Sequence, residues 1–121
     1  ALTIRATLPT LLEAGSGHYV ITGSVAGRRA LPGSLYSSTK WAVTGMAESL
    51  RQELRQMHEN STIRVTLVEP GMVDTDFFDN RPGTTHALAD DDIARAVMYA
   101  IDQPASVDIN EILIRPSSQP T

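Results

Sequence analysis

The sequence contains no cysteine, which excludes disulfide bonds, thiolate catalysis and cysteine-bound metals and is compatible with a cytoplasmic location. It also lacks any apolar run approaching the roughly 20 residues that a membrane-spanning helix needs. No secretory signal is visible in these residues. The net charge of -4, with basic residues scattered along the chain, argues against nucleic acid as the main partner. We therefore expect neither a membrane nor a nucleic acid as partner.

The composition is that of a globular chain, with 121 residues of which 41% are hydrophobic and 20% charged. Residues 1–121 are long enough for one domain or part of one. The chain starts at Ala1, and "ALTIRATLPTLLEAG" already carries a helical apolar stripe with no capping signal in front of it. We expect the chain to begin inside a helix and to represent a single partial domain.

Helical and strand patterns alternate along the chain. The opening helix is expected to stop near Gly15, and "HYVITGS" (18–24) has the nearly continuous apolar character of a strand buried on both faces of a parallel sheet. "IRVTLVEPG" (63–71) and "EILIRP" (111–116) are expected to form two further strands. This alternation is typical of parallel βαβ units, so we predict a doubly wound α/β fold.

Two helices complete the pattern. A long helix is expected after the loop "VAGRRALPGS", with an apolar face formed by Tyr36, Val43, Met46, Leu50, Leu54 and Met57. "IARAVMYAI" (93–101) predicts a second helix, and Asp90, Asp91 and Asp92 precede it. Negative charge favours a helix N-terminus, so these aspartates are interpreted as a capping cluster rather than as catalytic carboxylates. The histidines His18, His58 and His86 show no metal-ligand spacing, and no metal site is predicted.

Tyr36 and Lys40 lie in "LYSSTKWAV" four residues apart, which places both on one face of the long helix. A nearby ammonium favours the phenolate form of a tyrosine and makes such a pair suitable for general acid/base catalysis. Ligands bind at the carboxyl ends of parallel strands, and Ser24 and Pro70-Gly71 end two of the expected strands. A serine hydroxyl there could polarise a carbonyl group for reduction.

The motifs "ITGSVAGRRALPGSLYSSTK" and "VEPGMVDTDF", together with the ending "LADDDIARAVMYAIDQPASVDINEILIRPSSQ", resemble the short-chain dehydrogenase/reductase family through nearly the whole chain. The resemblance implies a Rossmann-like doubly wound sheet of which residues 1–121 are the C-terminal part. The family's glycine-rich phosphate loop belongs to the N-terminal half, which is absent. The implied activity is hydride transfer between a nicotinamide cofactor and a small carbonyl or alcohol substrate. NADP is the expected cofactor, with NAD possible.

The resemblance also implies a role for each site residue. Tyr36 would be the catalytic acid/base, Lys40 would assist it and hold the nicotinamide ribose, and Ser24 would position the substrate oxygen. Cofactor contacts would come from residues that follow the next strand, namely Pro70, Gly71, Val73 and Thr75. Substrate identity would depend on Phe77 and the segment 77–87. The family implies a homodimer or homotetramer, with Trp41 as a packing or subunit-contact residue.

Three alternatives remain at this stage. "TGSVAGRR" nearly matches a dinucleotide phosphate loop, but Arg29 stands where the last glycine should be, and Tyr36 follows too closely. We therefore assign Ser24 to catalysis. A serine hydrolase would need G-x-S-x-G, and "GSVAG" places the serine wrongly. The non-enzyme alternative is a catalytically incomplete fragment that acts only as an assembly or interaction module.

Overall fold

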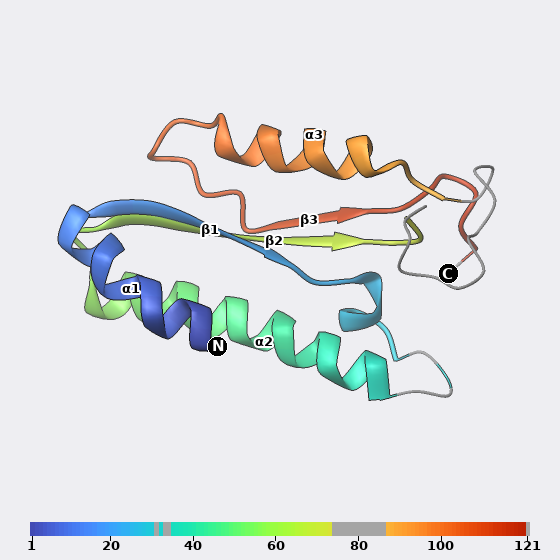
Figure 1. The fold of residues 1–121 in the computed structure, drawn as a ribbon, viewed down its shortest axis with the longest axis horizontal. Helices are drawn as coiled ribbons and strands as arrows, with labels where there is room; N and C mark the ends of the chain where they lie inside the picture. Colours follow the sequence, from blue (N-terminus) through green and yellow to red (C-terminus); the bar gives the residue numbers. More distant parts are fainter. Residues whose placement is uncertain (31, 33–34, 74–86, 121) are drawn as a thin grey trace.

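The computed structural model describes residues 1–30, 32, 35–73 and 87–120. The helices and strands follow in the order α1 (Leu2–Ala14), β1 (Ser16–Thr22), the short 3-10 helix η1 (Val25–Gly27), α2 (Leu35–Met57), β2 (Thr62–Pro70), α3 (Asp90–Ile101) and β3 (Glu111–Ile114). Figure 1 shows α1 and α2 on one face of the sheet and α3 on the other. The predicted doubly wound α/β architecture is confirmed.

The three strands form one parallel sheet in the order β1-β2-β3. The register pairs Ser16 with Thr62 at the start of β1 and Thr22 with Val68 at its end. All three strands therefore end at the same edge of the sheet, on the right in Figure 1, where α2 and α3 begin. This edge is where an α/β sheet binds its ligands.

Helix α1 ends where the sequence predicted. Gly15 follows it with φ of 75°, a left-handed conformation that glycine adopts without strain, and its N–H donates to the carbonyl oxygens of Leu11 and Leu12. The helix therefore turns directly into β1. Three of its side chains, Leu8, Leu11 and Leu12, are partly buried and pack against the core.

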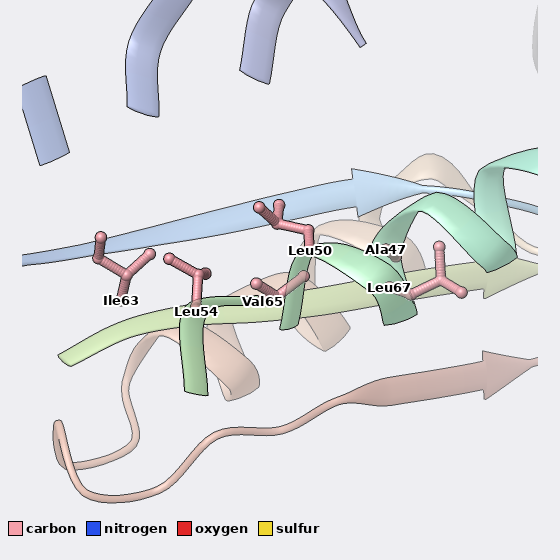
Figure 2. Close-up of a cluster of buried hydrophobic side chains, with 6 residues drawn as sticks. All are labelled: Ala47, Leu50, Leu54, Ile63, Val65 and Leu67. Carbon is pink, nitrogen blue, oxygen red and sulfur yellow. The ribbon is translucent and has the colours of Figure 1, made fainter. Parts of the chain in front are cut away.

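The main core lies between α2 and β2. Figure 2 shows its six buried members, which are Ala47, Leu50, Leu54, Ile63, Val65 and Leu67. The expected apolar face of α2 was wrong at its two ends, because Met57 is 69% exposed and Tyr36 is 43% exposed. Tyr36 instead lies at the carboxyl edge of the sheet, beyond the residues that pack on the core.

Strand β2, rather than β1, is the strand buried on both faces. Five consecutive residues of β2, from Val65 to Glu69, are buried, whereas the residues of β1 are half-buried or exposed. The expectation of full burial for 18–24 was wrong for residues 18–22. The physical reason is position in the sheet: within the described residues, β2 has a neighbour on each side and β1 pairs only with β2.

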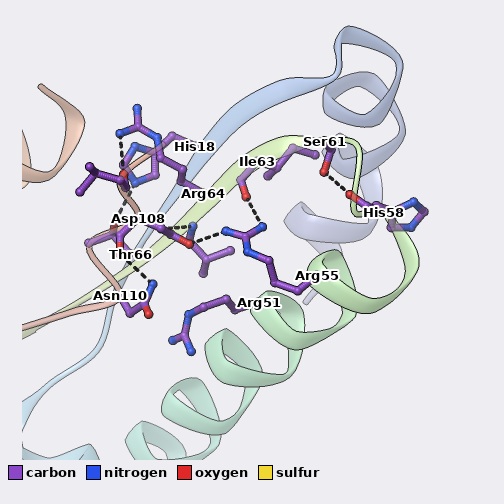
Figure 3. Close-up of polar contacts among 12 residues, drawn as sticks. His18, Arg51, Arg55, His58, Ser61, Ile63, Arg64, Thr66, Asp108 and Asn110 are labelled. Carbon is purple, nitrogen blue, oxygen red and sulfur yellow. Dashed lines mark hydrogen bonds and ion pairs between the residues drawn. The ribbon is translucent and has the colours of Figure 1, made fainter. Parts of the chain in front are cut away.

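A polar cluster closes the amino end of the sheet (Figure 3). The Asp108 carboxylate accepts from the Val65 N–H at 3.1 Å and from the Arg55 guanidinium at 2.7 Å. The His18 Nε2 lies 2.7 Å from the Thr66 hydroxyl, and burial, followed by the charge of Arg64, lowers the pKa of His18. These contacts link β1 to β2, and α2 and β2 to Asp108, while the Nδ1 of His18 has no hydrogen-bond partner within the described residues. Among the described residues no cluster of potential metal ligands occurs.

The aspartates at the start of α3 behave as the sequence predicted. Asp90, Asp91 and Asp92 occupy the first turn, and the Asp92 carboxylate accepts from the N–H of Ala89, the N-cap residue, at 2.9 Å. Arg95 forms ion pairs with Asp91 and Asp92. No helix within the described part of the chain is long and apolar enough to cross a membrane.

Candidate active site

A pocket of about 410 Å³ opens at the carboxyl edge of the sheet. Its lining residues are Thr22, Gly23, Ser24, Tyr36, Lys40, Pro70, Gly71, Val73, Asp90 and Ile93. Six residues selected from the sequence thus surround one space, although they come from three separate segments. Two others, Thr75 and Phe77, lie outside the described residues, as does most of the segment 77–87.

Ser24 leaves β1 and begins η1. Its backbone is extended, with φ of -167° and ψ of 159°, and its Oγ accepts a hydrogen bond from the Ala26 N–H at 3.1 Å. The residue is buried apart from its exposure to the pocket it lines. Because the oxygen already accepts from the backbone, the hydroxyl hydrogen is the part suited to donate to a ligand.

Helix α2 fixes the segment that carries Ser24. The Ser37 hydroxyl lies 2.7 Å from the Ala26 carbonyl oxygen and 2.9 Å from that of Arg29. The Thr44 hydroxyl lies 3.2 Å from the Gly27 carbonyl oxygen. Sequence reasoning missed both hydroxyl residues. Their seven-residue spacing on one helix face was the available signal, because buried hydroxyls on a packed face need partners.

Gly27 allows η1 to approach α2 closely. A Cβ atom at this position would lie 2.6 Å from the Lys40 carbonyl oxygen and 2.7 Å from the Thr44 hydroxyl oxygen. Any side chain would therefore push η1 away from the turn of α2 that carries Lys40. The requirement for glycine explains this position without a phosphate-binding role.

Tyr36 and Lys40 form the predicted pair. The Lys40 ammonium lies 5.5 Å from the centroid of the Tyr36 ring, a distance at which a cation is attracted to the ring face. Lys40 is half-buried and forms no ion pair with a described residue. Both side chains line the pocket, so a phenol hydroxyl and a positive charge adjoin the same space.

The floor of the pocket is made by backbone that leaves the strands. The Gly23 N–H donates to the Val68 carbonyl oxygen at 2.7 Å, and the Gly71 N–H donates to that of Ile114, also at 2.7 Å. Val73 then pairs with Leu88 in an isolated parallel bridge. The Pro70–Val73 segment is thus held by β3 and by the chain that leads into α3.

One buried charge at this edge was not anticipated from the sequence. Glu69, next to Pro70, has a fully buried side chain, and its Oε2 lies 3.4 Å from the Nε of Arg28. The Arg28 guanidinium also donates to the Glu111 carboxylate at 3.1 Å. Burial, and secondly the charge of Glu111, raise the pKa of Glu69 to about 6. A lone glutamate in an apolar strand was the sequence signal that could have revealed it.

Comparison with known proteins gives the family. The profile of the short chain dehydrogenases matches residues 1–85. The chain belongs to the short chain dehydrogenase family. An uncharacterized oxidoreductase from Listeria monocytogenes is 39% identical over 97% of this chain and 51% of its own length. One from Staphylococcus aureus is 40% identical over 94% of this chain and 48% of its own length.

Solved structures of this family have the same fold. An alcohol dehydrogenase from Thermococcus sibiricus, complexed with 5-hydroxy-NADP, is 31% identical with a TM-score of 0.83 over 98% of this chain and 49% of its own. The closed form of a serine dehydrogenase complexed with NADP+ is 32% identical with a TM-score of 0.86, over 97% of this chain and 51% of its own. The expected Rossmann-like fold is confirmed. The chain spans about half the length of these relatives.

The phosphate-loop alternative for "TGSVAGRR" gains no support from the structure. Ser24 begins a 3-10 helix of three residues, and Arg28 follows as its C-cap residue. A dinucleotide phosphate loop instead leads into a longer helix whose N-terminus faces the pyrophosphate.

Proposed function

We propose that this chain carries the catalytic group and the nicotinamide-binding side of an NADP-dependent oxidoreductase that acts on a small carbonyl or alcohol substrate. The observation that carries the proposal is that Ser24, Tyr36 and Lys40 line one pocket together with residues of the Pro70–Val73 segment. Membership of the short chain dehydrogenase family and the NADP complexes of two neighbours support it. In this proposal residues 1–121 are one part of a dinucleotide-binding domain.

The walls of the pocket fit a nicotinamide ring. Pro70, Val73 and Ile93 give it apolar sides, and Gly23 and Gly71 let the backbone approach closely. Lys40 supplies a donor for ribose hydroxyls, and the backbone at Val73 is suited to the carboxamide. Thr75 is proposed to contact the same half of the cofactor. When bound, the reduced cofactor supplies the hydride that adds to the substrate carbon.

The roles of the side chains follow from their chemistry. The Ser24 hydroxyl donates a hydrogen bond to the substrate carbonyl oxygen and polarises the bond. The Tyr36 hydroxyl then gives its proton to that oxygen, which completes the alcohol, and in the oxidative direction the phenolate takes the proton back. Lys40, whose ammonium lies beside the Tyr36 ring, is proposed to assist this proton transfer. Phe77 is proposed to contact the substrate.

The test is an assay of the full-length protein with NADPH and with NADH. Substrates would be small aldehydes and ketones in one direction, and 3-hydroxy amino acids and simple alcohols in the other. The last two classes are chosen because similar proteins are a serine dehydrogenase and an alcohol dehydrogenase. We expect turnover to be faster with NADPH than with NADH.

Two controls separate the alternatives. A fluorophosphonate probe that labels Ser24 stoichiometrically would favour a hydrolase. A native product of 13.1 kDa by intact mass, without nicotinamide binding, would favour the non-catalytic assembly module.

A further inference from the structure

Glu69 is a fully buried carboxylate that has no part in the chemistry proposed above. It precedes Pro70 on β2. Its Cγ lies 3.6 Å from the position that a Cβ atom on Gly23 would occupy, so its side chain passes beneath the residue before Ser24. Glu69 therefore contacts both the serine segment and the strand end that forms the pocket floor.

The partners of this carboxylate are few. Within the described residues neither of its oxygens has a hydrogen bond. The charged groups that face it are Arg28, the C-cap residue of η1, with its Nε at 3.4 Å, and Glu111 from β3. Arg28 also pairs with Glu111, which makes its guanidinium a bridge between η1 and the two strands.

Such an arrangement costs stability, because a buried charge loses its hydration and an ion pair rarely repays the loss in full. An apolar residue at position 69 would stabilise the core more than glutamate does. Leu67, two residues earlier on the same face of β2, is such a residue and belongs to the core. The carboxylate instead attracts the Arg28 guanidinium at the end of η1, an interaction that apolar packing does not supply. The Ser37 hydroxyl holds the same segment through the Ala26 and Arg29 carbonyl oxygens.

We propose that Glu69 is a positioning residue: its carboxylate holds Arg28 and thereby keeps residues 24–28 in the arrangement that presents the Ser24 hydroxyl to the pocket. This inference rests on the proposed function for its catalytic consequence. The attraction requires the charged form of Glu69. Because its pKa is about 6, Glu69 is charged at neutral pH, where it attracts Arg28.

The structural test measures hydrogen exchange in the full-length protein. We compare the amides of residues 26–29 with those of β1, in the parent and in Glu69→Gln. Exchange at residues 26–29, corrected for intrinsic rates, should rise about 10-fold in the variant, while β1 stays protected. The matched control is Glu53→Gln, the same chemical change at an exposed position of α2. It should alter neither region.

The kinetic test uses the same variants. Glu69→Gln should lower kcat by about 10-fold with little change in the KM for NADPH, because a displaced serine affects the substrate oxygen rather than the cofactor. Glu69→Asp, which keeps the carboxylate, should recover part of the rate. Arg28→Gln should reproduce the effect, and the double variant should be no worse than either single one.

The outcomes are distinguishable. Unchanged exchange at residues 26–29 in both Glu69→Gln and Arg28→Gln would overturn the inference, whatever the activity. Faster exchange in the absence of any nicotinamide-dependent turnover in the parent would support the structural link while refuting the proposed function. If Glu69→Gln does not fold, Arg28→Gln, which removes the exposed partner of the ion pair, provides the same test. Unchanged protection at residues 26–29 in Arg28→Gln would then overturn the inference.

Discussion

The ammonium of Lys40 lies 5.5 Å from the centre of the Tyr36 ring, one turn away on the same helix. This relationship places a positive charge next to the group that is proposed to transfer the proton, and both residues line the pocket that Ser24 also reaches. Both residues lie on α2, and substitution of each in turn tests proton transfer and cofactor binding separately.

Replacement of Tyr36 by phenylalanine should abolish turnover in the full-length protein. The change keeps the ring and removes only the transferable proton, so we expect a loss of roughly 10²- to 10⁴-fold in kcat with NADPH affinity mostly retained. Steady-state kinetics and calorimetric binding measure the two effects. Activity within a few-fold of the parent would refute the assignment.

Replacement of Lys40 by methionine should damage both rate and binding. The variant keeps a long apolar side chain but loses the charge that is proposed to serve both the ribose and Tyr36. We expect weaker NADPH binding and lower kcat in the same protein. An unchanged dissociation constant for NADPH would remove the ribose role while leaving the effect on the tyrosine open to the kinetic measurement.

The Gly27→Ala variant should be destabilised by about 1 to 3 kcal/mol, because its methyl group would press on the Lys40 carbonyl and the Thr44 hydroxyl. The matched control is Gly45→Ala in the interior of α2, where a Cβ atom would meet nothing within 4 Å. This control should gain about 0.5 to 1 kcal/mol from helix propensity. Urea unfolding of both variants tests the contrast, and equal shifts would contradict it.

Stability should depend on the protonation of Glu69. Its pKa in the folded protein, about 6, lies above its ordinary value of 4.5, so the native state binds the proton more tightly. The contribution of Glu69 to the free energy of unfolding should therefore fall by about 2 kcal/mol as the pH rises from below 4.5 to above 6. Urea unfolding across this range should show the fall in the parent and lack it in Glu69→Gln.

Residues 1–121 expressed alone should not bind a dinucleotide tightly or catalyse turnover. Within the described residues the outer edge of β1 has no partner strand, and such an edge invites pairing with another chain. We expect self-association or partial unfolding, measured by sedimentation, together with no tight NADPH binding by calorimetry. A monomer that binds NADPH with micromolar affinity would contradict this prediction.

The sequence predicted those parts of the molecule that depend on local chemistry. Gly15 ended α1 because its left-handed conformation needs glycine, and the aspartates at 90–92 marked the start of α3. The positions of Ser24 and Pro70 at strand ends were predictable as well, because parallel strands share one carboxyl edge. The four-residue spacing of Tyr36 and Lys40 gave their common face.

The remaining features depend on contacts between segments distant in sequence. The half-burial of β1 follows from its position at the side of the described sheet. The residues of β1 alone do not determine the strand order. The role of Gly27 required the proximity of α2, and the bridge from Arg28 to Glu69 joins residues far apart along the chain. Sequence patterns identify such residues as unusual but do not give their partners.

The polar cluster at the amino end of the sheet also indicates where the chain can be lengthened. The turn from α2 to β2 lies at that end, its residues Glu59 and Asn60 are exposed, and Ser61 closes it with hydrogen bonds to the His58 carbonyl oxygen. Exposed turn tips tolerate inserted segments best. A peptide tag or fluorescent reporter grafted between Glu59 and Asn60 should therefore leave the pocket at the opposite edge intact, which makes this turn a practical handle for immobilising the protein during cofactor-binding measurements.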